Sequence, residues 1–213
     1  MEIHKSFELL ISSYKLRTHL SKKSPLIKKV PAHRSRLMAR NYICPMKILM
    51  VCLGNICRSP LAEGILQHKA WQSGLKWSVE SAGTSGFQKG EEPHPLSQKV
   101  ARQKGIDISQ QRARKFEAQD FERFDKIYAM SQDIIEDMKH IAKNKFDEKK
   151  VELLLNESFP GKNMDIPDPW FGLEPGFHQT YKIIEEACDA IIKKYSTSNP
   201  GSYRDQYSIP SNK

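Results

Sequence analysis

Residues 46–66, MKILMVCLGNICRSPLAEGIL, contain the segment that most restricts how this chain can fold. The apolar run 47–52 predicts a strand covered on both faces, as in a parallel sheet. A tight loop over 53–57 follows, and a Ser-Pro pair then predicts a helix over about 60–73 with Ser59 as its N-cap. A buried strand, a tight loop and a helix are typical of the first unit of an α/β sheet.

The rest of the chain repeats this alternation of strands and helices. We therefore expect a single three-layer α/β domain with a four-stranded, parallel, doubly wound sheet in the flavodoxin-like order 2-1-3-4. Ligands bind such sheets at the carboxyl ends of strands, where the strand order reverses. The further expected elements are strands over 77–82, 124–130 and 151–155, helices over 96–104 and 133–142, and a final helix with an apolar stripe from Phe177 to Tyr195.

Charge is distributed unevenly along the 213 residues, whose net charge is +9. Residues 1–45 contain ten Lys/Arg and two Asp/Glu, whereas the rest of the chain contains 24 and 23. The body is thus nearly neutral, which argues against nucleic-acid binding by the body. No apolar run approaches the ~20 residues that span a bilayer, so we expect no membrane association.

The composition also divides the chain. We expect a basic, disordered N-terminal extension over 1–45, a folded domain over 46–195 and a disordered C-terminal tail over 196–213. The Arg- and Ser-containing extension leaves two further possibilities open, an organellar transit peptide or an upstream start codon before a natural beginning at Met46. The four cysteines show no disulfide-scaffold or metal-binding spacing, which indicates a reducing, cytoplasmic location unless the extension is a transit peptide.

The loop after the first strand predicts an anion site. Gly54 and Asn55 tolerate positive φ, so the chain can curl there and turn its amide N–H groups inward. Such a nest at a helix N-terminus binds an anion and favours the thiolate of Cys52. Arg58, with five residues between it and Cys52, can donate to two phosphate oxygens. A nucleophile beneath a phosphate site indicates phosphoryl transfer, although a bare Cys-x5-Arg pattern also occurs by chance.

A general acid is the second requirement, because a thiolate that attacks a phosphate monoester must expel an alkoxide or phenolate. Asp168 is the candidate, in a turn-rich loop where Pro167 and Pro169 stiffen its backbone. Most Asp-Pro pairs are ordinary surface turns, and Asp165 is the nearest competitor.

The string CLGNICRSP over 52–60 resembles the signature of the low-molecular-weight protein tyrosine phosphatases, and the resemblance extends over about 46–195. It implies hydrolysis of phosphotyrosine and aryl phosphates through a phosphocysteine intermediate, with no cofactor and no metal. It places the general acid/base role on Asp168, because the family carries this group in an Asp-Pro-aromatic loop. It also implies a phosphotyrosine-containing protein as partner, and we expect a monomer or weak dimer.

The resemblance assigns supporting roles as well. Ser59 would donate to the sulfur of Cys52, and Ser81 would brace the strained loop through Asn55. Cys57 would capture oxidised Cys52 as a reversible disulfide, or it simply fills buried space. The residues expected to contact bound phosphate are Leu53, Gly54, Asn55, Ile56, Cys57 and Ser59.

Aromatic residues near the site predict a slot for a phenyl ring, walled by Phe87, Trp170, Phe171 and Ile56. Ile56 resembles the tyrosine-directed members, since protein-arginine phosphatases of similar fold have threonine there. Three positions depart from family patterns: Gln110 replaces a histidine of mammalian members, Ser131 replaces a frequent acidic residue, and Trp170-Phe171 replaces a tyrosine pair.

Two rival functions remain. A thiol-dependent arsenate reductase needs a further cysteine pair near the site, and only Cys188, on the final helix's apolar stripe, is left in the body. A non-catalytic phosphate-binding module with a nucleic-acid-binding tail is the other, although Asp168 would place an unhelpful negative charge in such a site.

Overall fold

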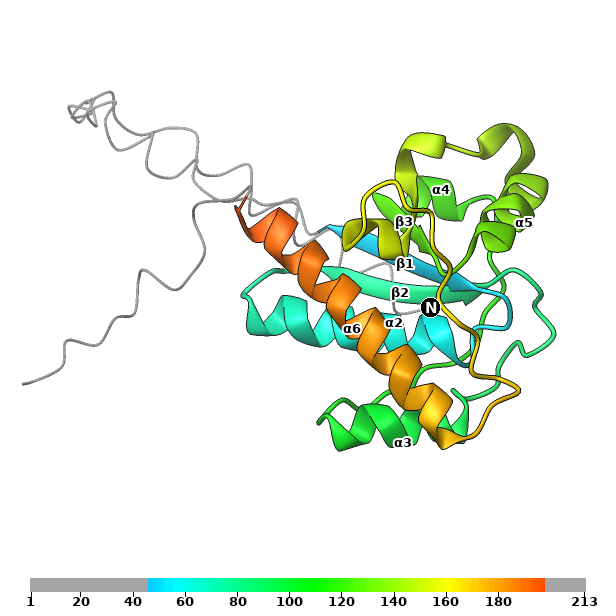
Figure 1. The fold of residues 1–213 in the computed structure, drawn as a ribbon. Helices are drawn as coiled ribbons and strands as arrows, with labels where there is room; N and C mark the ends of the chain where they lie inside the picture. The colour runs from blue at the N-terminus through cyan, green and yellow to red at the C-terminus, as the bar shows by residue number, and fades with distance from the viewer. Residues whose placement is uncertain (1–45, 198–213) are drawn as a thin grey trace, which may run out of the picture. The chain divides into compact units, whose positions relative to one another are not determined.

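Four parallel strands form one sheet in the order β2-β1-β3-β4, which confirms the expected order 2-1-3-4. The structure, a computed structural model, describes residues 46–197 (Figure 1). The strands are β1 (Lys47–Cys52), β2 (Ser78–Gly83), β3 (Lys126–Ala129) and β4 (Val151–Leu153). The helices are α2 (Arg58–Gln72), α3 (Pro95–Gln103), α4 (Asp120–Arg123), α5 (Gln132–Ala142) and α6 (Glu174–Thr197), with short 3₁₀ turns at Lys143–Lys145, Glu148–Lys150 and Leu154–Glu157.

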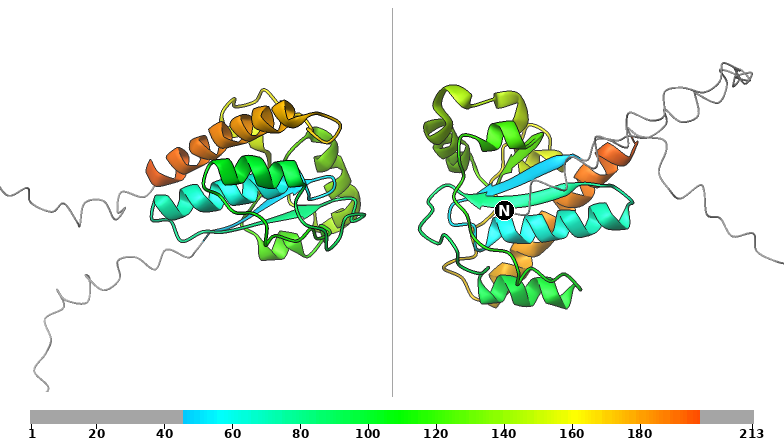
Figure 2. Two further views of the ribbon diagram at one scale, coloured as in Figure 1. Left: turned by 90° about the horizontal axis from the view of Figure 1, so that it is seen from below. Right: turned by 180° about the vertical axis from the view of Figure 1, so that it is seen from behind.

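The central strand β1 explains the three layers, because its alternate side chains enter two separate cores. Ile48, Met50 and Cys52 pack with residues of α2, α3 and α6. Leu49 and Val51 pack on the opposite face with residues of α4 and α5. The helices accordingly cover both faces of the sheet, as the two further views in Figure 2 show.

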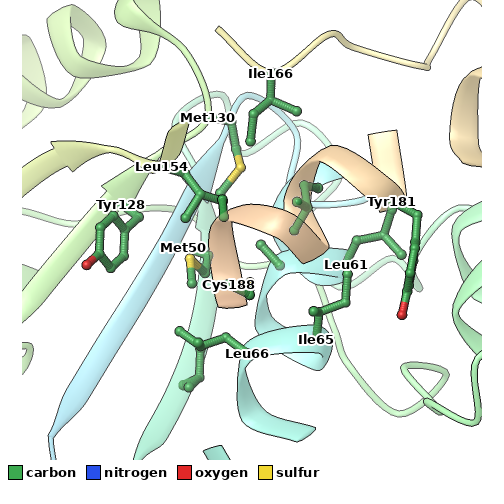
Figure 3. Close-up of a cluster of buried hydrophobic side chains, with 14 of the residues drawn as sticks. Met50, Leu61, Ile65, Leu66, Tyr128, Met130, Leu154, Ile166, Tyr181 and Cys188 are labelled. Atoms are coloured by element: carbon green, nitrogen blue, oxygen red, sulfur yellow. The ribbon is translucent and has the colours of Figure 1, made fainter. Parts of the chain in front are cut away.

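The core beneath α6 packs the sheet against the two longest helices, α2 and α6. Met50 of β1, Leu61 of α2 and Cys188 of α6 are fully buried there, and Figure 3 shows them beside Leu154 and Ile166. Ile166 lies two residues before Asp168, so this core also anchors the loop that carries the candidate acid.

Several boundaries differ from those expected. β4 ends at Leu153 because the chain turns into a 3₁₀ segment, and the expected tail from 196 instead continues α6 to Thr197. α2 begins at Arg58, its N-cap is Cys57, and no side chain caps it. The expectation that Ser59 caps this helix is therefore wrong, because its hydroxyl faces the Cys52 sulfur.

No helix among residues 46–197 is long and apolar enough to cross a membrane. The predictions for the extension 1–45, including Cys44, and for the tail over 198–213 lie outside the described residues.

Candidate active site

The candidate nucleophile is the last residue of β1, at the carboxyl edge of the sheet. Cys52 pairs with Gly83 of β2, and β3 lies on the other side of β1. This is where the strand order reverses, the position at which doubly wound sheets bind ligands. The loop 53–57 then leads directly into α2.

The backbone of the loop 53–57 is curled by one left-handed residue. Asn55 has φ 58°, whereas Gly54 does not use positive φ. The carbonyls of Leu53 and Ile56 accept from the backbone N–H groups of Ser85 and His94, at 2.9 and 2.8 Å. These bonds direct the carbonyl oxygens toward neighbouring loops, which favours an anion-binding face lined by amides.

Two groups lie within hydrogen-bond distance of the Cys52 sulfur, and the side chain itself is 3% exposed. The backbone N–H of Asn55 donates to Sγ at 3.2 Å, and the Ser59 hydroxyl lies 3.0 Å from it. Donors aimed at a sulfur stabilise its anionic form relative to the thiol.

The Asn55 side chain is fixed on three sides. Its Oδ1 accepts from the backbone N–H of Arg114 at 2.9 Å, and its Nδ2 donates to Ser59 at 3.0 Å and to Ser81 at 2.8 Å. These bonds hold the left-handed residue in place, which asparagine tolerates better than most residues. The expected contact between Asn55 and Ser81 is thus present, while its functional role stays a prediction.

The guanidinium of Arg58 meets the candidate acid. Nη2 donates to Asp168 Oδ2 at 2.5 Å, and Nη1 donates to the carbonyl of Ile166 at 3.2 Å. Arg58 is 6% exposed, and its buried Nε has no hydrogen-bond partner among the residues that the structure describes. A buried N–H of this kind favours a ligand oxygen beside it.

The loop between 164 and 172 separates the two candidate acids. Asp168 points to Arg58, and its Oδ1 accepts from the backbone N–H of Trp170 at 3.1 Å. Asp165 instead accepts from the backbone N–H of Gln132 at 2.8 Å, at the start of α5. Asp165 therefore supports a helix terminus, and Asp168 is the carboxylate in contact with Arg58.

Cys57 is also buried, at 5% exposure. Burial raises the pKa of its thiol to about 12, and the nearby negative charges of Asp168 and Cys52 add to this effect. Cys57 is accordingly a neutral thiol at physiological pH. The predicted redox role stays a prediction.

The aromatic residues expected to form a slot differ in exposure. Phe87 and Phe171 are 90% and 97% exposed, Trp170 is 44% exposed, and Ile56 is buried. The Trp170 ring contacts the His94 ring edge-on at 5.6 Å, and His94 stacks on Phe177 at 4.9 Å. His94 also caps α3, since its Nδ1 accepts from Leu96 N–H, and desolvation lowers its pKa.

Two of the positions at which the sequence departs from family patterns, Gln110 and Ser131, differ in burial. Gln110 is exposed and its side-chain amide donates to Ser109. Ser131 is buried, and its hydroxyl has no hydrogen-bond partner within residues 46–197. Within residues 46–197, neither side chain forms a hydrogen bond with Cys52, Arg58 or Asp168.

Sequence reasoning missed three residues around the site: Glu63, His94 and Arg114. Glu63 accepts from Ser81 at 2.6 Å. It lies four positions after Ser59 on α2, so helical spacing could have linked the two. Arg114 acts through its backbone N–H, for which the sequence carries no signal.

The fold and these contacts define a class: a small α/β protein in which a cysteine, an arginine and an aspartate converge at the carboxyl edge of a parallel sheet. The family model described as low molecular weight phosphotyrosine protein phosphatase matches residues 47–199. The chain belongs to this family of protein-tyrosine-phosphatases, which are hydrolases.

Individual relatives agree with the family match. The human low molecular weight phosphotyrosine protein phosphatase is 34% identical over 150 residues, which cover 69% of this chain and 94% of the relative. The crystal structure of YfkJ from Bacillus subtilis has a TM-score of 0.68 and 30% identity, covering 75% of this chain and 99% of that one. Vibrio vulnificus Wzb in complex with benzylphosphonate has a TM-score of 0.64 and 29% identity, covering 70% and 98%.

Proposed function

We propose that this phosphatase hydrolyses phosphotyrosine through a phosphocysteine formed on Cys52. The observation that carries the proposal is the pair of hydrogen-bonding groups at the Cys52 sulfur, together with Arg58, which contacts Asp168. A sulfur with two donors is suited to be both nucleophile and leaving group.

In the first step, Sγ of Cys52 attacks phosphorus and the bond from phosphorus to the aryl oxygen breaks. Asp168, in its protonated form, gives its proton to that oxygen, so a neutral phenol leaves. Arg58 and the amides of the loop 53–57 bind the equatorial oxygens, where negative charge is spread in a loose transition state.

In the second step, water attacks the phosphorus of the phosphocysteine. The Asp168 carboxylate takes a proton from the water, and the P–S bond breaks to give inorganic phosphate and the Cys52 thiolate. The Ser59 hydroxyl, 3.0 Å from Sγ, stabilises the departing sulfur.

A phosphotyrosine-containing protein is the substrate that we propose. Trp170 and Phe171 follow the Asp168-Pro169 pair and provide apolar surface for a phenyl ring. The human relative is named for phosphotyrosine, and Wzb was crystallised with benzylphosphonate, an aryl-bearing phosphonate. Phosphoserine would be too short to bring its phosphorus to a sulfur that is only 3% exposed.

The test is hydrolysis of an aryl phosphate, in reductant and without added metal, by the intact protein, Cys52→Ser and Asp168→Asn. We expect no activity in the first variant, a large loss in the second and no effect of a chelator. Persistent activity in Cys52→Ser would overturn the proposal and favour the phosphate-binding module with adventitious hydrolysis.

We also propose that residues 1–45 are dispensable for catalysis. The family match to 47–199 supports this, as does the position of Met46 immediately before β1. Deletion of residues 1–45 should leave kcat/KM unchanged, and any affinity of the intact protein for nucleic acid should disappear. Loss of catalysis in a folded deletion variant would contradict this division.

A further inference from the structure

Four hydrogen bonds connect Cys52 to the carboxylate of Glu63, to which the proposed mechanism gives no role. Ser59 Oγ lies 3.0 Å from the Cys52 sulfur, and Asn55 Nδ2 donates to Ser59 at 3.0 Å. The same Nδ2 donates to Ser81 at 2.8 Å. Ser81 then donates to Glu63 Oε2 at 2.6 Å.

The direction of every bond in this chain follows from one fixed donor. The backbone N–H of Arg114 can only donate, so the atom of Asn55 that faces it is Oδ1. Nδ2 therefore faces the two serines and gives one proton to each of them. Both serine oxygens act as acceptors from Asn55, and each serine has a single proton left to donate.

The remaining protons have defined acceptors. Ser81 is 7% exposed, and its proton goes to the Glu63 carboxylate. Ser59 is fully buried, and its proton faces the Cys52 sulfur at 3.0 Å, with the Ala82 carbonyl more distant at 3.5 Å. When Glu63 is ionised and Cys52 is a thiolate, each serine proton in this network therefore has an anionic acceptor.

We propose that Glu63 is a positioning residue for the nucleophile: by accepting the proton of Ser81, it fixes the network through which Asn55 orients Ser59 toward the Cys52 sulfur. This inference rests on the proposed role of Cys52. Glu63 itself contacts Ser81 and acts through it.

The surroundings of Glu63 make this network sensitive to pH. Burial raises the pKa of Glu63 from 4.5 to about 7, opposed by the hydrogen bond from Ser81. The charged groups that face it are Glu80 of β2, which raises the pKa further, and Arg114 of the segment before α4, which lowers it. Below about pH 7 the carboxyl becomes protonated and less suited to accept from Ser81.

Protonation of Glu63 has a defined structural consequence. If the new O–H donates to Ser81, the oxygen of Ser81 receives donors from both Glu63 and Asn55, and its own proton loses the acceptor that it had. A buried network with one unsatisfied member is less stable than a complete one. Ser59 is then held less firmly opposite the sulfur.

Three variants of the full chain separate this role from a merely structural one. Glu63→Gln keeps an oxygen acceptor for Ser81 but cannot titrate, whereas Glu63→Leu removes the acceptor. Glu80→Gln removes a charge next to Glu63 and leaves in place the chain of hydrogen bonds that runs from Ser81 through Asn55 and Ser59 to Cys52. The two readouts are kcat and KM for an aryl phosphate, and the rate of Cys52 alkylation by iodoacetate between about pH 5 and pH 8.

We expect Glu63→Leu to lower kcat about tenfold or more with little change in KM, because a misplaced donor weakens the transition state rather than substrate binding. Glu63→Gln should restore kcat to within about twofold of the wild type at pH 8. The ratio of its alkylation rate to that of the wild type cancels the ionisation of Cys52 itself and should change in a step near pH 7, where Glu63 titrates. Glu80→Gln should move that step to lower pH.

Wild-type kcat in folded Glu63→Leu, or a ratio of Glu63→Gln to wild-type alkylation rates that stays constant between about pH 5 and pH 8, would overturn the proposal. If Glu63→Leu does not fold, the profile of Glu63→Gln decides alone. Cys52→Ser is measured in parallel: activity in that variant refutes the proposed function, whereas an inactive Cys52→Ser with unaffected Glu63 variants refutes only the role of Glu63.

Discussion

Arg58 and Asp168 are 110 positions apart in the sequence, yet Nη2 of the guanidinium lies 2.5 Å from Oδ2 of the carboxylate. The contact joins the N-terminus of α2 to the loop before α6. A bound phosphate would draw on the same guanidinium donors, since arginine binds phosphate through paired N–H groups. In the mechanism that we propose, substrate binding would therefore compete with this ion pair and leave the carboxylate beside the leaving oxygen.

Replacement of Asp168 by Asn should slow the reaction most for substrates with poor leaving groups. A general acid contributes about 10²–10⁴-fold when the leaving oxygen needs a proton, and less when the phenolate is already stable. The measurement is kcat/KM for a series of aryl phosphates of increasing phenol pKa, since kcat/KM reports the step in which the phenol leaves. Asp165→Asn is the matched control, because Asp165 caps the start of α5 rather than contacting Arg58. An equal loss in both variants would refute the assignment to Asp168.

A methyl group at Gly83 should distort the loop 53–57. A Cβ there would lie 2.6 Å from the carbonyl oxygen of Leu53 and 2.9 Å from the amide nitrogen of Asn55, both backbone atoms. We expect Gly83→Ala to lower kcat/KM by about 10²-fold, since displacements near 1 Å have that effect.

The control for this prediction is Gly176→Ala on α6, where a Cβ meets no atom within 4 Å. Activity should be unchanged there, and stability should rise by roughly 0.5–1 kcal/mol from helix propensity. Full activity in Gly83→Ala would show that the close approach of β2 to the loop is not required.

Cys52 and Cys57, at the two ends of the loop after β1, should differ in reactivity. The pKa of Cys57 is about 12, so on the order of 10⁻⁴ of its thiols or fewer are ionised near pH 7.5. Iodoacetate should therefore label Cys52 and leave Cys57 unmodified until the protein is unfolded, and inorganic phosphate should protect Cys52. Both cysteines lie between Lys47 and Arg58, so the label is located by fragmentation of that one peptide. Equal labelling of Cys57 in the folded protein would contradict the prediction.

Glu63 should make the protein less stable as pH rises. Because its pKa is raised from 4.5 to about 7 in the folded state, the folded protein holds this proton more tightly than the unfolded chain. This contribution to stability is present below about pH 4.5 and is lost as pH rises through about 7.

Glu63→Gln removes this dependence. We compare the free energy of unfolding of the variant with that of the wild type at each pH. The value for the variant minus that for the wild type should be larger at about pH 8 than at about pH 5, by on the order of 2 kcal/mol after allowance for solvent screening. Urea unfolding at the two pH values measures it. An unchanged difference between variant and wild type at both pH values would contradict a buried, titrating carboxylate.

Much of the fold was predictable because each strand is a short apolar run followed by turn residues and a helical pattern. The strand order 2-1-3-4 and the position of Cys52 at the end of β1 both agree with the structure. The start of α2 was not predictable in the same way. The Ser-Pro pair is typical of a helix start at Pro60 with Ser59 as N-cap, but the helix begins at Arg58 and the Ser59 hydroxyl faces the Cys52 sulfur.

The candidate site was predictable only where chemistry is local in sequence. Cys52 and Arg58 flank one short loop, and Asp168 carries the signal of a stiff Asp-Pro turn. The bracing of Asn55 was harder to foresee, because Arg114 contributes a backbone N–H that any residue would supply. The contact between His94 and Trp170 depends on how α3 packs against the acid loop, which no local pattern specifies.

Trapping of the phosphoenzyme tests the central claim most directly. The intact protein is mixed with an aryl phosphate, quenched in acid within the first turnover and digested, and the phosphorus is located by mass spectrometry. We predict one phosphoryl group per chain, on the sulfur of Cys52, together with a burst of phenol of equal amount. Phenol released without a burst and without phosphorus on Cys52 would contradict the account.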